Sequence, residues 1–188
     1  MNTASPRQPL RRKLFSLVAL WPWVAGCSRA AGIDGNDPQL RFRGIGIVLV
    51  VDAVPGAEMK HAVLCDDREL PIYSPSLIAK RNRAIMALGG SRVPLTVRVT
   101  WREGAGWDKV KQVWNEGSII GDYTIPVAER IPEAVLADIR AHRGALRLKF
   151  RLKPDGVLFG WDIERDGAGT GQVFRYDMPG GDFLETHY

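Results

Sequence analysis

Two runs of residues near the C-terminus restrict the fold of this chain more than any other feature of its sequence. Residues 146–152 and 157–163 place apolar side chains at every second position, and the turn-forming Lys153-Pro154-Asp155-Gly156 separates them. A period of two on both sides of a turn predicts a β-hairpin with one apolar face. The register that aligns the two apolar rows pairs Leu152 with Val157, Phe150 with Phe159, Leu148 with Trp161 and Leu146 with Ile163.

The second face of this predicted hairpin carries the charges. The same register sets Arg147 opposite Asp162, and Glu164 follows two positions later on the same face. We expect this face to meet water. The Arg147–Asp162 pair is then an ordinary cross-strand ion pair, which contributes at most about 1 kcal/mol.

Further strands are predicted upstream of the hairpin. Residues 40–54 are rich in Ile and Val, which suits a strand that is buried on both faces. Residues 93–102 alternate strictly, residues 107–114 form an extended stretch between two turns, and residues 119–127 resume the alternation. These segments predict a meander of antiparallel strands.

Helices are the smaller part of the predicted fold. The clearest one begins at Ile131-Pro132-Glu133 and ends before Gly144. A weaker helix is predicted from Ser74-Pro75 to Gly89-Gly90. We therefore expect an α+β domain, mainly antiparallel β, with a sandwich-like or meander sheet and one or two covering helices.

The N-terminal segment has the order of a secretory signal. Basic Arg11-Arg12-Lys13 precedes an apolar run of 11 residues, 14–24, and small residues follow. Eleven residues rise only about 16 Å as a helix, so we do not expect a retained membrane span. Residues 11–15 (RRKLF) also resemble a twin-arginine signal, although Leu10 stands where Ser or Thr is usual. A basic n-region alone gives the same residues, so the export route stays open.

The end of this signal resembles the lipobox of bacterial lipoproteins. Val24-Ala25-Gly26-Cys27 matches the small residues and the cysteine whose thiol takes a diacylglyceryl group before cleavage. The resemblance implies a lipoprotein signal peptide over residues 1–26, a lipidated Cys27, a flexible membrane tether over residues 27–39, and a single β-rich periplasmic domain over residues 40–188. Ser28 after the cysteine, in place of Asp, favours the outer membrane over the inner membrane.

The charge of the mature chain argues against nucleic acid as a partner. The full chain has a formal charge of +5, from 26 Lys and Arg against 21 Asp and Glu. Residues 1–26 hold four of the cations and none of the acids, so cleavage leaves 22 against 21. A nearly neutral domain lacks the concentrated basic face that displaces counterions from phosphates.

The sequence contains no motif that predicts catalysis. The three His, at positions 61, 142 and 187, have no spacing that suits one metal ion, and there is no Cys pair for a metal site. No Gly-x-Ser-x-Gly occurs, and the glycine-rich residues 167–171 contain no Lys to reach a phosphate. We expect no metal, no cofactor and no enzymatic activity.

Two stretches carry a resemblance to a family. Residues 118–133 (SIIGDYTIPVAERIPE) and 156–165 (GVLFGWDIER), together with the lipobox, resemble proteobacterial lipoproteins found beside type VI secretion lipase effectors. Those lipoproteins act as periplasmic immunity proteins. The resemblance covers roughly residues 40–165 and implies a binding protein whose partner is a secreted lipase or another toxin effector, with the membrane bound through the N-terminal lipid.

Three functions follow from these features. The first is a lipid-anchored inhibitor of a type VI secretion lipase toxin, the second is a structural or assembly lipoprotein of the envelope, and the third is an exported hydrolase, which the absent motifs disfavour. Trp and Arg anchors usually carry most of the binding energy of an interface. For the inhibitor we therefore expect contacts from two loops at the end of the sheet, through Trp107, Asp108, Arg165, Asp162 and Glu164.

Overall fold

The computed structural model of the protein describes residues 37–80, 84–87, 92–167 and 173–186. These residues belong to one compact unit, residues 34–188. The predicted signal peptide, Cys27 and most of the predicted tether lie outside the described residues, as does most of the glycine-rich segment 167–171. No helix in the described part of the chain combines the length and the apolar character needed to cross a membrane.

The larger of two main sheets has five strands. Their order across the sheet is β13 (Phe174–Gly181), β12 (Gly156–Asp166), β11 (Ala145–Lys153), β1 (Gly46–Ala53) and β6 (Ala84–Ala87). β1 runs parallel to β11, and the other neighbours are antiparallel. The register predicted for the 146–163 hairpin is confirmed at all four apolar pairs, and the ladder extends by one pair at each end, Lys153 with Gly156 and Ala145 with Glu164.

The second main sheet has four antiparallel strands. Their order is β10 (Ser118–Pro126), β7 (Thr96–Glu103), β3 (Val63–Cys65) and β4 (Pro71–Tyr73). Two small ladders complete the strands: β2 (Glu58–Lys60) pairs with β5 (Leu77–Ala79), and β8 (Gly106–Asp108) pairs with β9 (Val113–Asn115). Among the described residues the helical elements are two 3-10 turns, Leu40–Phe42 and Ala128–Arg130, and one helix, α1 (Glu133–His142).

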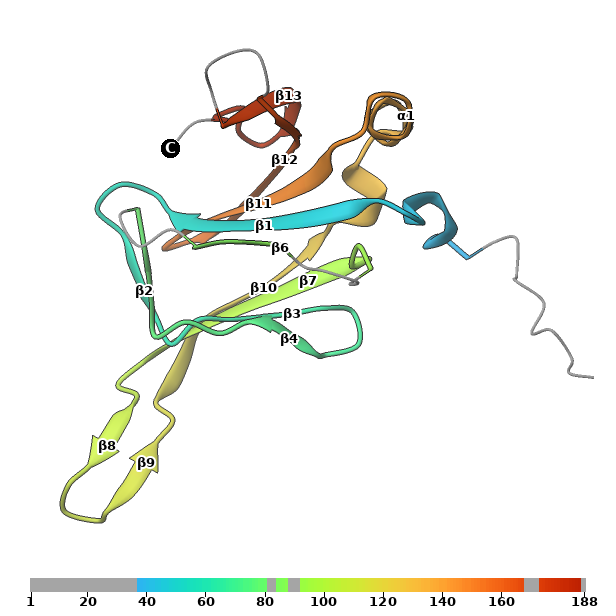
Figure 1. Ribbon diagram of the computed structural model, residues 1–188. Coiled ribbons are helices and arrows are strands. Elements are labelled where there is room, and N and C mark those ends of the chain that lie inside the picture. The colour runs from blue at the N-terminus through green and yellow to red at the C-terminus, as the bar shows by residue number, and fades with distance from the viewer. Residues whose placement is uncertain (1–36, 81–83, 88–91, 168–172, 187–188) are drawn as a thin grey trace, which may run out of the picture. The chain divides into compact units, whose positions relative to one another are not determined.

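The two main sheets form two layers with the hydrophobic core between them (Figure 1). The alternating apolar rows of β11 and β12 face this core, and so do the inward side chains Val97, Val99 and Trp101 of β7. α1 adds Val135, Leu136 and Ile139 to the same core. The predicted class, mainly antiparallel α+β with a covering helix, is confirmed. β1 is buried on both faces, as its continuous apolar composition predicts.

The predicted helix over residues 74–90 is wrong. The chain there forms the short strands β5 and β6. In β5 the buried Ile78 lies between two less buried neighbours, which is the period of a strand. β5 and β6 pair with β2 and β1, which lie well upstream in the sequence, so tertiary pairing overrides the local helical pattern.

The stretch 107–114 is also not a single extended strand. It folds back on itself as the hairpin of β8 and β9, with residues 109–112 in the turn. β10 has a register shift between Ile119 and Gly121. Because of this shift Ile119 is exposed, whereas Gly121 and Ile125 face the core as the alternation predicts.

Candidate functional site

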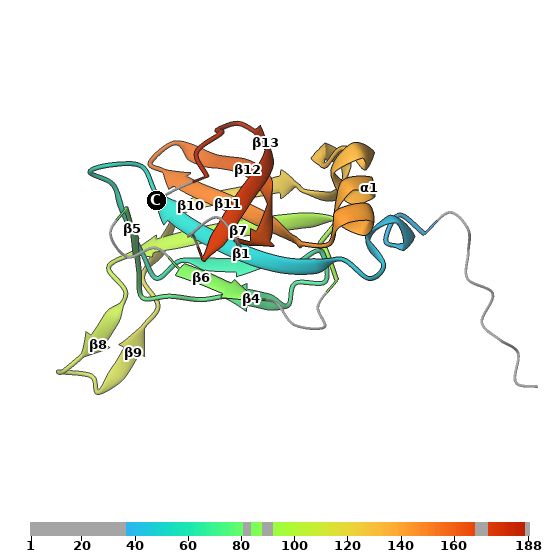
Figure 2. The ribbon, with the colours of Figure 1, turned by 45° about the horizontal axis from the view of Figure 1, so that its top comes forward.

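The β8–β9 hairpin projects beyond the sheet formed by β7 and β10 (Figures 1 and 2). Trp107 on β8 lies opposite Trp114 on β9. The two residues are 56% and 55% exposed, which is unusual for large aromatic side chains. The hairpin therefore presents a pair of indole rings to the surroundings of the domain.

Local chemistry explains why this hairpin forms. The Asp108 carboxylate accepts hydrogen bonds from the backbone N–H groups of Val110 and Lys111, at 2.9 and 3.0 Å. This closes an Asx turn, and Gln112 completes it with a positive φ of 51°. The ring of His61 meets Trp114 edge-on at 5.9 Å. The turn and this ring contact with the body of the domain both hold the hairpin.

The base of the hairpin depends on a glycine. Gly117 has a φ of +68°, and a Cβ at this position would lie 2.2 Å from the carbonyl oxygen of Glu103. No other residue fits this close approach of two backbones. The direction in which the hairpin leaves β7 and β10 is therefore set by the backbone.

Two open hollows flank the base of the hairpin. Their volumes are about 480 and 610 Å³, and both are lined by His61, Arg102 and Ala105. Trp114 lines the first hollow, and Ile120 lines the second. We call the exposed apolar side chains of the hairpin and of the adjoining start of β10 the hairpin surface: Trp107, Val110, Val113, Trp114, Ile119 and Ile120.

Two of the predicted contact residues lie on this hairpin. Trp107 belongs to the hairpin surface. The carboxylate of Asp108 is engaged in the turn and is only partly exposed, so its role here is to shape the hairpin. Sequence reasoning missed Trp114 as a contact candidate. The signal that could have found it is the turn-forming stretch between the two Trp residues, which permits them to lie opposite each other.

Asp162 and Glu164 do not lie at an exposed edge, contrary to the prediction. Asp162 has no exposed surface; its carboxylate accepts two hydrogen bonds from Arg147 at 2.7 Å each and lies 3.0 Å from Lys149 Nζ. Glu164 is partly buried, and burial raises the pKa of its carboxyl group despite the nearby charge of Arg147. The charged face of β11 and β12 is therefore covered.

Arg165 is likewise buried, at 8% exposed. Its guanidinium donates to Asp177 Oδ2 at 2.9 Å on β13, and it also donates to the Asp138 carboxylate and to the Arg143 carbonyl at α1. It thus joins the helix to the sheet. In both ribbon views α1 and the β8–β9 hairpin lie at opposite ends of the sheets, so the two predicted contact loops do not form one surface (Figures 1 and 2).

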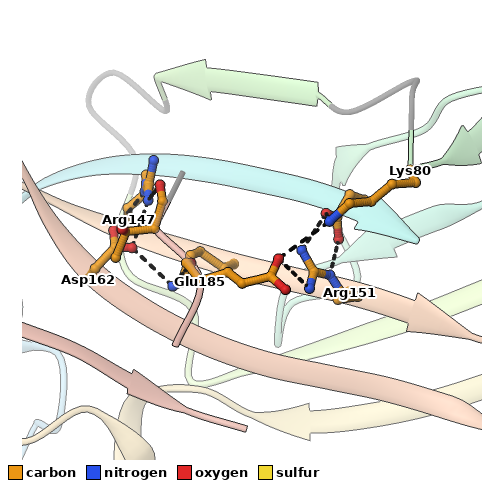
Figure 3. A network of polar contacts seen from close by, with 8 residues as sticks. Lys80, Arg147, Arg151, Asp162 and Glu185 are labelled. Atoms are coloured by element: carbon orange, nitrogen blue, oxygen red, sulfur yellow. Dashed lines mark hydrogen bonds and ion pairs between the residues drawn. The ribbon is translucent and has the colours of Figure 1, made fainter. Parts of the chain in front are cut away.

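The covered charges of β11 form a row. Arg147, Lys149 and Arg151 alternate with the apolar residues that face the core, and their side chains are 1%, 0% and 7% exposed. Arg151 donates two hydrogen bonds of 2.8 Å to the carboxylate of Asp52 on β1. Figure 3 shows Arg147 and Asp162 at one end of this network, Arg151 and Lys80 at the other, and Glu185 between them. We call Arg147, Lys149 and Arg151 the basic row.

Burial shifts the proton affinity of groups in this network. Desolvation lowers the pKa of Lys149, against the opposing charge of Asp162. The hydrogen bond from Arg151 lowers the pKa of Glu185. In this network carboxylate groups and basic side chains lie next to each other.

In the described ranges no three His, Cys, Asp or Glu side chains are arranged to hold a metal ion. The thiol of Cys65 is partly buried, and burial raises its pKa, which lowers its reactivity. The geometry of the hairpin surface suits contact with another molecule.

No family of proteins, no curated protein and no solved structure matches this chain.

Proposed function

We propose that this chain is a lipid-anchored periplasmic binding protein, and that it is an immunity protein that inhibits a type VI secretion lipase toxin. The observation that carries the binding role is the pair of exposed indole rings, Trp107 and Trp114, on the projecting β8–β9 hairpin. The lipobox at Cys27 supports the anchor, and the resemblance of residues 118–133 and 156–165 supports the immunity role.

The physical argument rests on preorganisation. A large exposed apolar side chain remains in contact with water in the free protein, and several of them together mark a site of interaction. The Asx turn at Asp108 and the backbone contact at Gly117 already fix the hairpin, so little conformational entropy is lost on binding. Trp is also the residue type most enriched among those that dominate binding energy.

Binding is tested with the product of the gene next to the one for this chain. The mature domain from Ser28 onward should form a one-to-one complex with that protein in calorimetry and suppress its lipid hydrolysis without releasing fatty acid itself. Trp107→Ala should weaken binding about thirtyfold, as expected for an interface anchor that contributes about 2 kcal/mol. The matched control is Leu70→Ala, which truncates a side chain of similar exposure, 52%, away from the hairpin.

The immunity role would be contradicted by the absence of heat in the calorimetry together with survival, under periplasmic toxin, of cells that lack this protein. A structural or assembly role in the envelope, with the hairpin surface as an assembly contact, would then be the better account. Equal loss of affinity in Trp107→Ala and Leu70→Ala would instead contradict the hairpin surface as the contact with the toxin.

The anchor is tested separately. Cys27→Ser should release the protein from the membrane fraction while leaving the domain folded, because acyl chains contribute about 0.8 kcal/mol per buried methylene and two chains suffice for stable attachment. Cell fractionation followed by immunoblotting measures this. A variant that still requires detergent for release would contradict the lipid anchor.

A further inference from the structure

The C-terminal residues cross the outer face of the five-stranded sheet. β13 ends at Gly181, whose φ of +95° turns the chain away from the sheet edge. Asp182 then fixes the exit, because its N–H donates to the Phe159 carbonyl and its carboxylate accepts from the Phe159 N–H and from Arg130. We call residues 182–186 the C-terminal strap.

The strap contacts every member of the basic row. Lys149 Nζ donates to the carbonyl oxygen of Glu185 at 2.8 Å, and Arg147 donates to the carbonyl oxygen of Thr186 at 2.7 Å. Arg151 lies 2.8 Å from the Glu185 carboxylate. Three strand cations are therefore satisfied in part by one short segment of extended chain.

The aromatic ring of Phe183 completes this contact. Lys149 Nζ and the Arg151 guanidinium lie 5.0 and 4.6 Å from the centre of the Phe183 ring, within the range of a cation–π interaction. A Cβ at Gly160, beneath the strap, would lie 3.0 Å from the Phe183 carbonyl oxygen. The absence of a side chain at residue 160 therefore allows the backbone of the strap to lie close to β12.

The strap itself remains at the surface. Leu184 is 63% exposed, and the side chain of Glu185 is 55% exposed. The cations beneath it also keep carboxylate partners that belong to the sheet, Asp162 for Arg147 and Asp52 for Arg151. Removal of the strap would thus leave these cations paired rather than isolated.

We propose that the basic row and its surroundings form a binding site for an extended peptide segment that carries an aromatic residue two positions before an acidic one, and that the C-terminal strap occupies this site within the same chain. Two of the contacts use main-chain carbonyl oxygens, which any extended segment supplies. Selectivity comes from the ring at the position of Phe183 and the carboxylate at the position of Glu185. The site is separate from the hairpin surface and does not depend on the function proposed above.

Occupation by the chain's own segment hides this site from a segment in solution. A tethered segment acts at an effective concentration in the millimolar range, so a free peptide has to compete with it. The apparent affinity for the free peptide equals the affinity of the open site multiplied by the fraction of molecules whose site is open. Weakening the strap should therefore strengthen the binding of a free peptide that has the original strap sequence.

The test uses the full chain and a fluorescent peptide of residues 180–186 with an amidated C-terminus. The double variant Phe183→Ala, Glu185→Gln should bind this peptide at least tenfold more tightly than the unaltered chain in fluorescence anisotropy, and added salt should weaken the complex. Leu184→Ala is the matched control, because it truncates an exposed neighbour in the same strap and should behave as the unaltered chain does. A peptide with the same two substitutions should bind the double variant at least tenfold more weakly.

Equal affinity of the unaltered chain and the double variant for the peptide, including no binding by either, overturns the proposal. So does an equal effect of Leu184→Ala. If the double variant does not unfold cooperatively, the single variant Glu185→Gln is measured in its place. It should bind the peptide about fivefold more tightly than the unaltered chain, because it loses a half-exposed ion pair within the strap contact. Equal affinity of this variant and the unaltered chain overturns the proposal.

The same variants show which protein supplies the segment that binds the site when the strap is displaced. If it is the strap of a second copy, the unaltered chain forms a dimer in sedimentation at high concentration, and the double variant does not. If the unaltered chain stays monomeric, the segment belongs to a different protein.

Discussion

The buried pair of Arg147 and Asp162 allows a sharp test of the energetics of the covered face. Asp162→Asn keeps the shape of the side chain but removes its charge, so Arg147 and Lys149 would remain in the interior without the carboxylate that both contact. Loss of one partner from a buried ion pair typically costs about 3 to 5 kcal/mol, because the remaining charge is desolvated and unpaired.

A second ion pair of the same geometry provides the control. Arg98 donates to the carboxylate of Asp122 at 2.8 and 2.6 Å, again between neighbouring strands, but the two side chains are 50% and 43% exposed. Water and salt screen such a pair, so its loss should destabilise the domain far less than the loss of a buried pair. Asp122→Asn therefore isolates the effect of burial from the effect of losing two hydrogen bonds.

Urea denaturation measures both variants. With a denaturant slope of about 2 kcal/mol per molar urea, Asp162→Asn should lower the midpoint by about 2 M, and Asp122→Asn should lower it by about 0.5 M or less. Equal shifts in the two variants would refute the argument, because they would mean that water reaches the Arg147–Asp162 pair and that the strap does not seal it.

Two further predictions concern packing and pH. Gly121→Ala should destabilise the domain by about 1 to 3 kcal/mol, because its Cβ would lie 2.1 Å from the buried Trp101 ring. Gly106→Ala is the control: a Cβ there would meet open space, so the change should cost less than about 1 kcal/mol. Equal shifts of the thermal midpoint in the two variants would contradict this reasoning. Burial raises the pKa of Glu164, so this group stabilises the fold while protonated and loses that contribution as the pH rises through its raised pKa. Glu164→Gln should therefore gain stability relative to the unaltered chain between pH 4 and pH 7 in denaturation curves, and a gain that does not change with pH would contradict the assignment.

The 145–166 hairpin could be predicted from the sequence in detail. Its register follows from two alternating rows and one turn, which are local features, and the structure confirms all four predicted apolar pairs. The exposure of its charged face could not be predicted in the same way. Arg147 and Lys149 are covered by the C-terminal strap, and Arg147 also by the Tyr176 ring of β13. The strap lacks the alternation or the helical period that would show where it lies.

The same distinction applies to the candidate site. Trp107 could be selected from the sequence because it stands beside turn-forming residues. Its partnership with Trp114 depends on where the chain reverses within residues 109–112, and the Asx turn that sets this position is made by one side chain, Asp108. Arg165 was selected as an exposed anchor, but its neighbours on α1 and β13 are supplied by the tertiary fold and bury it.

The parallel ladder between β1 and β11 has a consequence for the order in which the domain is made. β1 pairs with β11 from Gly46 with Ala145 to Ala53 with Leu152, so most of the domain must leave the ribosome or the export channel before that edge of β1 has a partner. Until then β1 presents a largely apolar strand with an unpaired edge, and such edges promote aggregation. Loop closure over so long a span also slows folding, to milliseconds or seconds in domains dominated by distant pairings. We therefore expect chains that stop before β11 to aggregate, and chains that extend through β12 to be the shortest ones that fold from a nascent state.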